Sequence, residues 1–199
     1  MGNKIRIKAI REISELNYLK SFAIDYYDKN NDENVWELVS RQGLKRLKNE
    51  IYNHESYTDG VMIFATNLEK TTVVVLKEFR VSAGGFVYTL PAGLMDPKES
   101  IKESAIREFK EETGLDFDVV TVDKERYTSV GIINEKVNIA YGYYSGKATQ
   151  KYQEESEYAE IEILDEERVK RILANEEVTV RSALLLKSFF NLNSFFNRS

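Results

Sequence analysis

The chain has no cysteine, one histidine and two prolines among its 199 residues. The lack of cysteine excludes disulfides, thiolate metal ligands, iron–sulfur clusters and a cysteine nucleophile. The single histidine, His54, excludes a multi-histidine metal site and argues against a Ser-His-Asp triad. The two prolines, Pro91 and Pro97, lie six residues apart, so the fixed φ angles of the chain are confined to one short segment.

Long apolar runs and an excess of basic residues are also missing. No stretch approaches the roughly 18 apolar residues of a membrane helix, and the N-terminal segment alternates charged and apolar residues, unlike a signal peptide. The 28 basic and 33 acidic side chains give a net charge of −5. This balance disfavours nucleic-acid binding, because neutralising phosphates requires a basic face. We therefore expect a cytoplasmic protein that binds neither membrane nor nucleic acid.

The residues that are present predict an α+β fold. Apolar residues make up 42% of the chain, as in ordinary globular proteins. Runs rich in apolar and β-branched residues predict strands at 18–27, 34–41, 60–66, 71–79, 86–90, 137–144 and 159–164. An apolar helix face is predicted at 184–190. The order of elements indicates a small N-terminal β unit, residues 1–57, followed by a main domain at 58–199.

The clearest local signal predicts a helix at 97–113. Asp96 is a suitable N-cap, Pro97 suits the first helical position, and Glu99 completes an Asp-x-x-Glu variant of the capping box. Gly114 is the expected C-terminal stop.

The carboxylates of this helix suggest a metal site. At about 100° per residue, Glu108 and Glu112 fall within or beside the apolar stripe, and Glu111 lies at its edge, one turn from Arg107. Neighbouring carboxylates repel unless a cation lies between them, and Mg²⁺ or Mn²⁺ prefers such oxygen ligands. An acidic surface helix is the alternative, because Glu is a good helix former. Charge alone leaves both interpretations open.

The spacing of the fixed residues is more specific. Gly93 is followed after five residues by Glu99, and after seven more by the run 107–115, REFKEETGL. The chain resembles Nudix hydrolases at every fixed position of their box. The resemblance implies a Nudix α/β/α sandwich and Mg²⁺-dependent hydrolysis of a nucleoside diphosphate linked to another group.

The flanking segments resemble the ADP-ribose pyrophosphatase branch of that family. The matching segments are Trp36-Glu37 with Arg41, Asp59-Gly60-Val61, Glu78-Phe79-Arg80, Gly84-Gly85, Leu90-Pro91-Ala92-Gly93-Leu94 and 183–187. The resemblance implies a homodimer whose N-terminal β units exchange between subunits, with Trp36 stacked on adenine and Glu37 and Arg41 near the base. Thr89 stands where many relatives carry Glu, which keeps another nucleoside diphosphate sugar open as the substrate.

The resemblance also implies roles for individual residues. Glu108 and Glu112 bind Mg²⁺ together with the Ala92 carbonyl, while Glu111 is either a further ligand or a partner of Arg107. The catalytic group comprises Glu135, Glu111 and Arg107, and the substrate-binding group comprises Trp36, Glu37, Arg41, Arg80 and Leu94.

Three of these roles have simpler alternatives. Glu135 is the expected general base on a loop, or else an exposed loop acid. Arg80 contacts phosphate, or else lies at the surface, and Trp36 packs in a core if it does not stack on adenine. The expected reaction converts ADP-ribose to AMP and ribose 5-phosphate. A pyrophosphatase for another nucleotide sugar and a non-catalytic nucleotide-sensing Nudix module are the alternatives.

Overall fold

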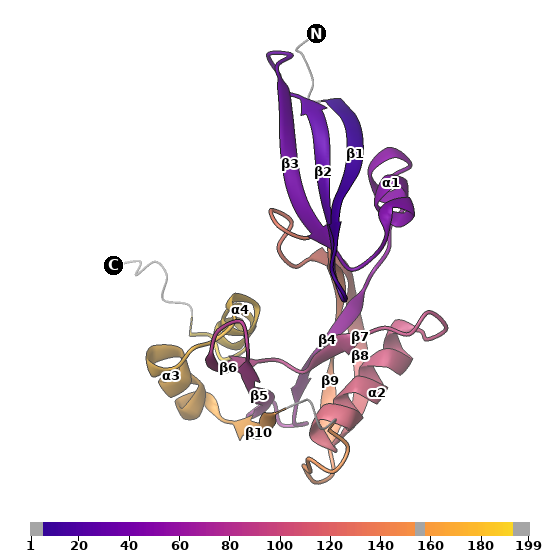
Figure 1. Cartoon of the computed structure of the whole chain (residues 1–199). Coiled ribbons are helices and arrows are strands. Elements are labelled where there is room, and N and C mark those ends of the chain that lie inside the picture. Colours follow the sequence, from indigo (N-terminus) through magenta and orange to yellow (C-terminus); the bar gives the residue numbers. More distant parts are fainter. Residues whose placement is uncertain (1–5, 154–157, 193–199) are drawn as a thin grey trace. The chain divides into compact units, whose positions relative to one another are not determined.

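The computed structural model describes residues 6–153 and 158–192 (Figure 1). The chain forms two compact units: unit 1 comprises residues up to 60 with 124–138, and unit 2 comprises 61–123 with the residues from 139 onward. The elements are β1 (Arg6–Glu15), β2 (Lys20–Tyr27), β3 (Glu33–Ser40), α1 (Leu44–Tyr52), β4 (Gly60–Thr66), β5 (Val73–Arg80), β6 (Gly85–Thr89), β7 (Ala92–Leu94), α2 (Ile101–Thr113), β8 (Asp116–Tyr127), β9 (Lys136–Ser145), β10 (Ala159–Leu164), α3 (Glu166–Asn175) and α4 (Val180–Phe189). Within these elements, none of the helices has the length and apolar character needed to cross a membrane.

Unit 1 contains a three-stranded antiparallel sheet with the order β1-β2-β3, and helix α1 packs against it (Figure 1). Ile10, Phe22 and Ile24 of the first two strands form its core with Leu47 of α1. The predicted strands at 18–27 and 34–41 correspond to β2 and β3. Strand β1 and helix α1 were not predicted, because their many charged residues interrupt the apolar pattern.

Unit 2 is built around a sheet with the order β10-β5-β4-β9-β8, to which β6 adds beside β5 and β7 beside β4. Strand β4 is buried along its whole length, as its unbroken apolar sequence predicts. Its residues alternate between two cores. Ile63 packs in the core that contains Phe109 of α2, whereas Phe64 packs in the core that contains Val169 of α3 and Leu186 of α4. Helix α2 therefore covers one face of the sheet, and α3 and α4 cover the other.

The start of α2 differs from the prediction. Ser100 is the N-cap: its hydroxyl accepts a hydrogen bond from the Glu103 N–H, and the Glu103 side chain accepts one from the Ser100 N–H. The prediction that Asp96 caps the helix, with Glu99 as its capping partner, was wrong. Residues 96–99 form a separate turn closed by the Glu99 N–H to the Asp96 carbonyl, with Pro97 at its second position. The predicted stop at Gly114 is confirmed, with a φ of 70°.

The remaining predicted elements are present with small shifts of their ends, as β4, β5, β6, β9, β10 and α4. Strand β8 and helix α3 were not predicted, because each carries charged residues on a largely exposed side. The division into units groups residues 124–138 with the N-terminal segment, whereas the boundary at residue 57 places them in the main domain.

Candidate functional site

Arg107 on α2 is the centre of an ion cluster in unit 2. Its guanidinium donates to both oxygens of Glu99, from Nε to Oε1 at 2.7 Å and from Nη2 to Oε2 at 2.8 Å. The Ser104 hydroxyl adds a third hydrogen bond to Glu99. The pKa of Glu99 is lowered to about 2, chiefly by the Arg107 hydrogen bond and then by that from Ser104. Glu99 therefore connects the turn before α2 to the body of the helix.

The same guanidinium reaches three further acceptors. Nη1 donates to Oε1 of Glu108 at 2.8 Å and to Oε2 of Glu111 at 3.0 Å, and Nη2 donates to the Leu94 carbonyl at 3.1 Å. These contacts raise the pKa of Arg107, with the Glu99 hydrogen bond as the largest cause. The Glu111 side chain is 50% exposed. Of its two predicted roles, a further metal ligand or a partner of Arg107, the contact seen in the structure is the one with Arg107.

The Glu108 carboxylate packs directly on the backbone of β7. A Cβ atom at position 93 would lie 1.9 Å from Cδ and from Oε2 of Glu108, so only glycine permits this approach. The Glu108 side chain is 14% exposed. A half-buried carboxylate held between the Arg107 guanidinium and a glycine is a well-defined oxygen donor.

Glu112 contacts the same short strand. Its Oε2 accepts a hydrogen bond from the Ala92 N–H at 2.9 Å, and its own backbone carbonyl accepts one from the Gln153 side chain at 2.7 Å. The structure thus brings Glu108, Glu112 and Ala92 together; these are the three residues for which the sequence predicts a role as metal ligands. They come together because both of their elements are attached to β4: strand β7 pairs with β4, and helix α2 packs against β4 through Phe109.

The donor chemistry fits a hard divalent cation with few protein ligands. Three carboxylates, Glu99, Glu108 and Glu111, are linked to a single guanidinium, so this cluster carries net negative charge. Glu112 adds a fourth carboxylate beside Ala92 of β7. Among the described residues, no group of three or more His, Asp or Glu side chains is arranged to enclose a metal ion. Mg²⁺ is commonly held by one or two carboxylates, with waters and substrate phosphates completing the shell.

Two predicted substrate residues of unit 2 lie at the surface. The Arg80 side chain is 52% exposed, and its Nη2 lies 2.6 Å from Oε2 of Glu78. The Leu94 side chain is also exposed, while its carbonyl accepts the Arg107 hydrogen bond.

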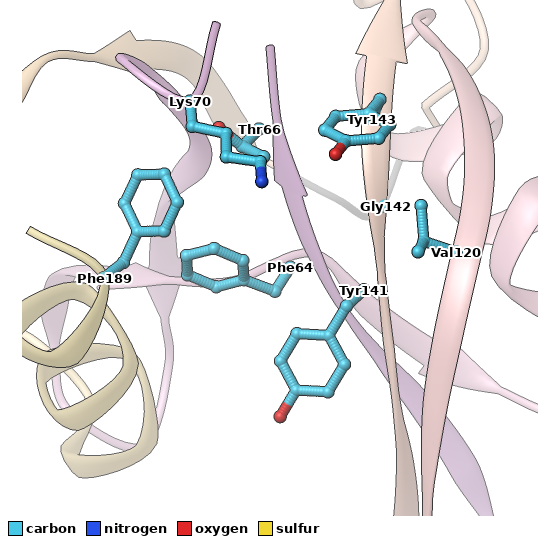
Figure 2. Close-up of a pocket in the computed structure, with 8 residues that line it drawn as sticks. All are labelled: Phe64, Thr66, Lys70, Val120, Tyr141, Gly142, Tyr143 and Phe189. Carbon is cyan, nitrogen blue, oxygen red and sulfur yellow. The ribbon is translucent and has the colours of Figure 1, made fainter. Parts of the chain in front are cut away.

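Unit 2 also contains a cavity of about 340 Å³, whose lining residues are drawn in Figure 2 and include none of these carboxylates. Phe64, Tyr141 and Phe189 line it, and all three pack with the core under α3 and α4. Because that core lies on the sheet face opposite α2, the cavity is on that face too. None of the predicted site residues lines it.

Unit 1 carries the predicted adenine residues. Trp36 on β3 is 48% exposed, so it is not part of the unit's core. Glu37, the next residue along the strand, is also exposed and lies opposite Ala23 of β2. Adjacent residues of a strand point to opposite faces, so the two side chains leave the sheet in different directions.

Arg41 and Glu135, which are separated by 94 positions in the sequence, form an ion pair within unit 1. Arg41 Nε lies 2.5 Å from Glu135 Oε1, and the Thr128 hydroxyl donates to Oε2 at 2.8 Å. The Glu135 side chain is 15% exposed, which excludes the alternative of a freely solvated loop acid. No pattern in the sequence predicts this contact, because Thr128 and Arg41 belong to no local motif with Glu135.

Comparison with known proteins agrees with the predicted box. A family model described as NUDIX domain matches residues 56–184. The chain is 25% identical to the ADP-ribose pyrophosphatase of Bacillus subtilis over 145 residues, which cover 72% of this chain and 76% of that protein. It is 28% identical to a GDP-mannose pyrophosphatase of Cronobacter sakazakii over 141 residues, 66% of this chain and 70% of that protein. The chain spans about half or less of the length of the first three curated relatives that it matches.

A solved structure shares the fold over almost the whole chain. The crystal structure of an ADP compounds hydrolase superposes with a TM-score of 0.71 at 20% identity, covering 98% of this chain and 97% of that chain. This likeness, with helices on both faces of the unit 2 sheet, confirms the predicted α/β/α sandwich.

Proposed function

Since the chain belongs to the NUDIX domain family, we propose that it hydrolyses the diphosphate of ADP-ribose with the help of Mg²⁺, giving AMP and ribose 5-phosphate. The contact of the Glu108 carboxylate with Gly93 carries this proposal, because it places a box carboxylate on the strand that also contacts Glu112. The curated ADP-ribose pyrophosphatases among the relatives support the choice of substrate.

Glu108 and Glu112 would hold the metal ion, with the Ala92 carbonyl as a further oxygen ligand. When bound, Mg²⁺ neutralises charge on the diphosphate and acidifies a bound water. Mn²⁺ offers the same chemistry with similar ligand preferences. Arg107 fixes Glu108 and keeps Glu111 beside it.

Glu135 is the proposed proton acceptor. As a water oxygen bonds to one phosphorus, its proton passes to the Glu135 carboxylate and the phosphorus–oxygen bond of the diphosphate breaks. The electron pair of that bond leaves with the second phosphate. Glu135 is held by Arg41 and Thr128 in the structure, and it has to exchange at least one of these contacts for the water.

Trp36, Glu37 and Arg41 are the proposed adenine-binding residues, and Arg80 and Leu94 the remaining substrate contacts. The half-exposed Trp36 supports this assignment, because an indole outside the core can stack on a base. Exposed apolar residues on the unit 1 sheet, Ile13 and Val35, support a homodimer in which this unit meets a second copy. The cytoplasmic location and the absence of nucleic-acid binding stay predictions from composition.

The decisive experiment measures kcat/KM for ADP-ribose, GDP-mannose and other nucleotide sugars with Mg²⁺. We expect ADP-ribose to be the preferred substrate and Glu112→Gln to lose at least about a hundredfold in kcat. Glu160→Gln is the control, since this exposed glutamate on β10 lies outside the site. Equal rates for Glu112→Gln and the wild type would refute the metal role.

Another nucleoside diphosphate sugar is the second candidate substrate. Thr89 and the similarity to a GDP-mannose pyrophosphatase favour it, and a higher kcat/KM for that substrate would select it. A non-catalytic sensing module would bind nucleotide without turnover in excess Mg²⁺.

A further inference from the structure

Helix α1 carries a nearly buried ion cluster outside the proposed site. Arg46 Nε lies 3.0 Å from Oε1 of Glu50, one helical turn later, and Arg46 Nη2 lies 2.9 Å from Oδ1 of Asp59. The side chains of Arg46, Glu50 and Asp59 are 18%, 11% and 5% exposed. One guanidinium therefore joins a helix to the residue that precedes strand β4.

The second oxygen of each acid faces the loop that carries Glu135. Asn134 donates from Nδ2 to Oε2 of Glu50 at 2.5 Å, and the Lys136 N–H donates to Oδ2 of Asp59 at 3.2 Å. The Asp59 N–H also donates to the Lys136 carbonyl at 2.8 Å. The residues immediately before and after Glu135 are thus held by two different acids, and both acids are held by Arg46.

The geometry of the cluster depends on a planar, forked cation. Arg46 reaches Glu50 and Asp59 with separate nitrogens, and its guanidinium carbon lies 4.9 Å from the centre of the Tyr57 ring. A lysine ammonium is a single point of charge and cannot hold both acids in this way. Burying three charges costs desolvation energy, and a network of this kind is better suited to fixing a geometry than to adding stability.

We propose that Arg46, Glu50 and Asp59 are positioning residues that fix the backbone on both sides of Glu135. The inference rests on the proposed role of Glu135 as the proton acceptor. With positions 134 and 136 held, the Glu135 side chain can exchange Arg41 or Thr128 for the attacking water while its backbone stays fixed. Loosening the cluster lets the whole loop segment shift, which lowers the fraction of bound substrate that has the carboxylate in place.

Asn134→Ala is the first test variant, because it releases one side of the loop and leaves the ion pairs of Arg46 intact. We expect kcat for ADP-ribose to fall about tenfold or more, with KM within about twofold, because misplacing a reacting group by about 1 Å can cost a hundredfold in rate. Asn53→Ala is the matched control: among the described residues, the side chain of this exposed asparagine, which caps the end of α1, hydrogen-bonds only to Asn49. Unchanged kcat in Asn134→Ala, with the same melting temperature, overturns the proposal.

Arg46→Lys extends the test through a double-mutant cycle with Glu135→Gln. If the cluster acts through Glu135, Arg46→Lys lowers kcat strongly in the wild type and has little further effect in Glu135→Gln. Equal losses in both backgrounds would indicate a general structural role and refute the positioning role. Full activity of Glu135→Gln alone would instead refute the role of Glu135 as proton acceptor, and no turnover of ADP-ribose by the wild type would refute the proposed function, so these failures are distinguishable.

Discussion

The close approach of Glu108 to Gly93 predicts that Gly93→Ala separates activity from stability. The added Cβ would lie 1.9 Å from the carboxylate, whereas ordinary carbon contacts begin near about 3.5 Å. The carboxylate therefore has to move by roughly 1.5 Å. Metal–ligand distances tolerate changes of only about 0.2 Å, so Glu108 leaves the metal position in this variant.

The cost to folding is much smaller, because the displaced group is the end of a flexible side chain. The φ angle of Gly93 is not positive, so alanine fits the backbone without strain. We expect a loss of about 1–2 kcal/mol in unfolding free energy, typical of a local steric adjustment. We expect kcat to fall by at least about a hundredfold, as for other losses of a directly acting group.

The assay combines kcat for ADP-ribose as a function of Mg²⁺ concentration with thermal unfolding of the same samples. Gly43→Ala is the control, since a Cβ at position 43 has no atom within 4 Å and φ is −74°. Wild-type activity and wild-type Mg²⁺ dependence in Gly93→Ala would refute the idea that Glu108 must stay against this strand.

Three further predictions concern separate parts of the chain. Because the pKa of Glu99 is lowered to about 2, its contribution to stability is present above about pH 4.5 and is lost as the pH falls toward 2. Between pH 5 and pH 3, the melting temperature of Glu99→Gln, measured by circular dichroism, should therefore decline less than that of the wild type. Trp36→Ala should raise KM for ADP-ribose about tenfold with little change in kcat, because stacking on a base contributes about 1–3 kcal/mol. The melting temperature should change little because the indole is half exposed, and an unchanged KM would contradict adenine stacking. Chelation with EDTA should abolish turnover, and Mg²⁺ or Mn²⁺ should restore it, whereas activity that persists in the chelator would argue against the metal.

Local sequence patterns were sufficient for the parts of the site that lie on one element. The spacing of Arg107, Glu108 and Glu112 along a helix decides which side chains share a face, and the structure places them as that spacing indicates. The start of the helix was misplaced because two capping signals overlap. Ser100 offers a reciprocal hydrogen-bond pair, whereas Pro97 favours a turn that closes before the helix begins.

Contacts between distant segments were beyond the sequence patterns. The pairing of Arg41 with Glu135 and the link from Asn134 to Glu50 depend on how unit 1 folds around the loop at 128–136. No periodicity marks such pairs, because each partner is an ordinary charged or polar residue in its own segment. The exposure of Trp36 likewise depends on the tertiary structure: Trp36 lies opposite Ile24, on the side of the sheet that α1 packs against, but outside the core that Ile24 forms with Leu47.

The burial of strand β4 has a consequence for how substitutions act at a distance. The Ile63 N–H donates to the Pro91 carbonyl at 2.8 Å, so the segment that contacts the Glu108 and Glu112 carboxylates is attached to the central strand of the sheet. Every residue of β4 is buried, and alternate residues belong to opposite cores. A shift of the strand by one residue would therefore move each side chain into the wrong core. Volume-changing substitutions at Val61 or Ile63 will therefore behave partly as active-site mutations, lowering turnover in molecules that are still folded.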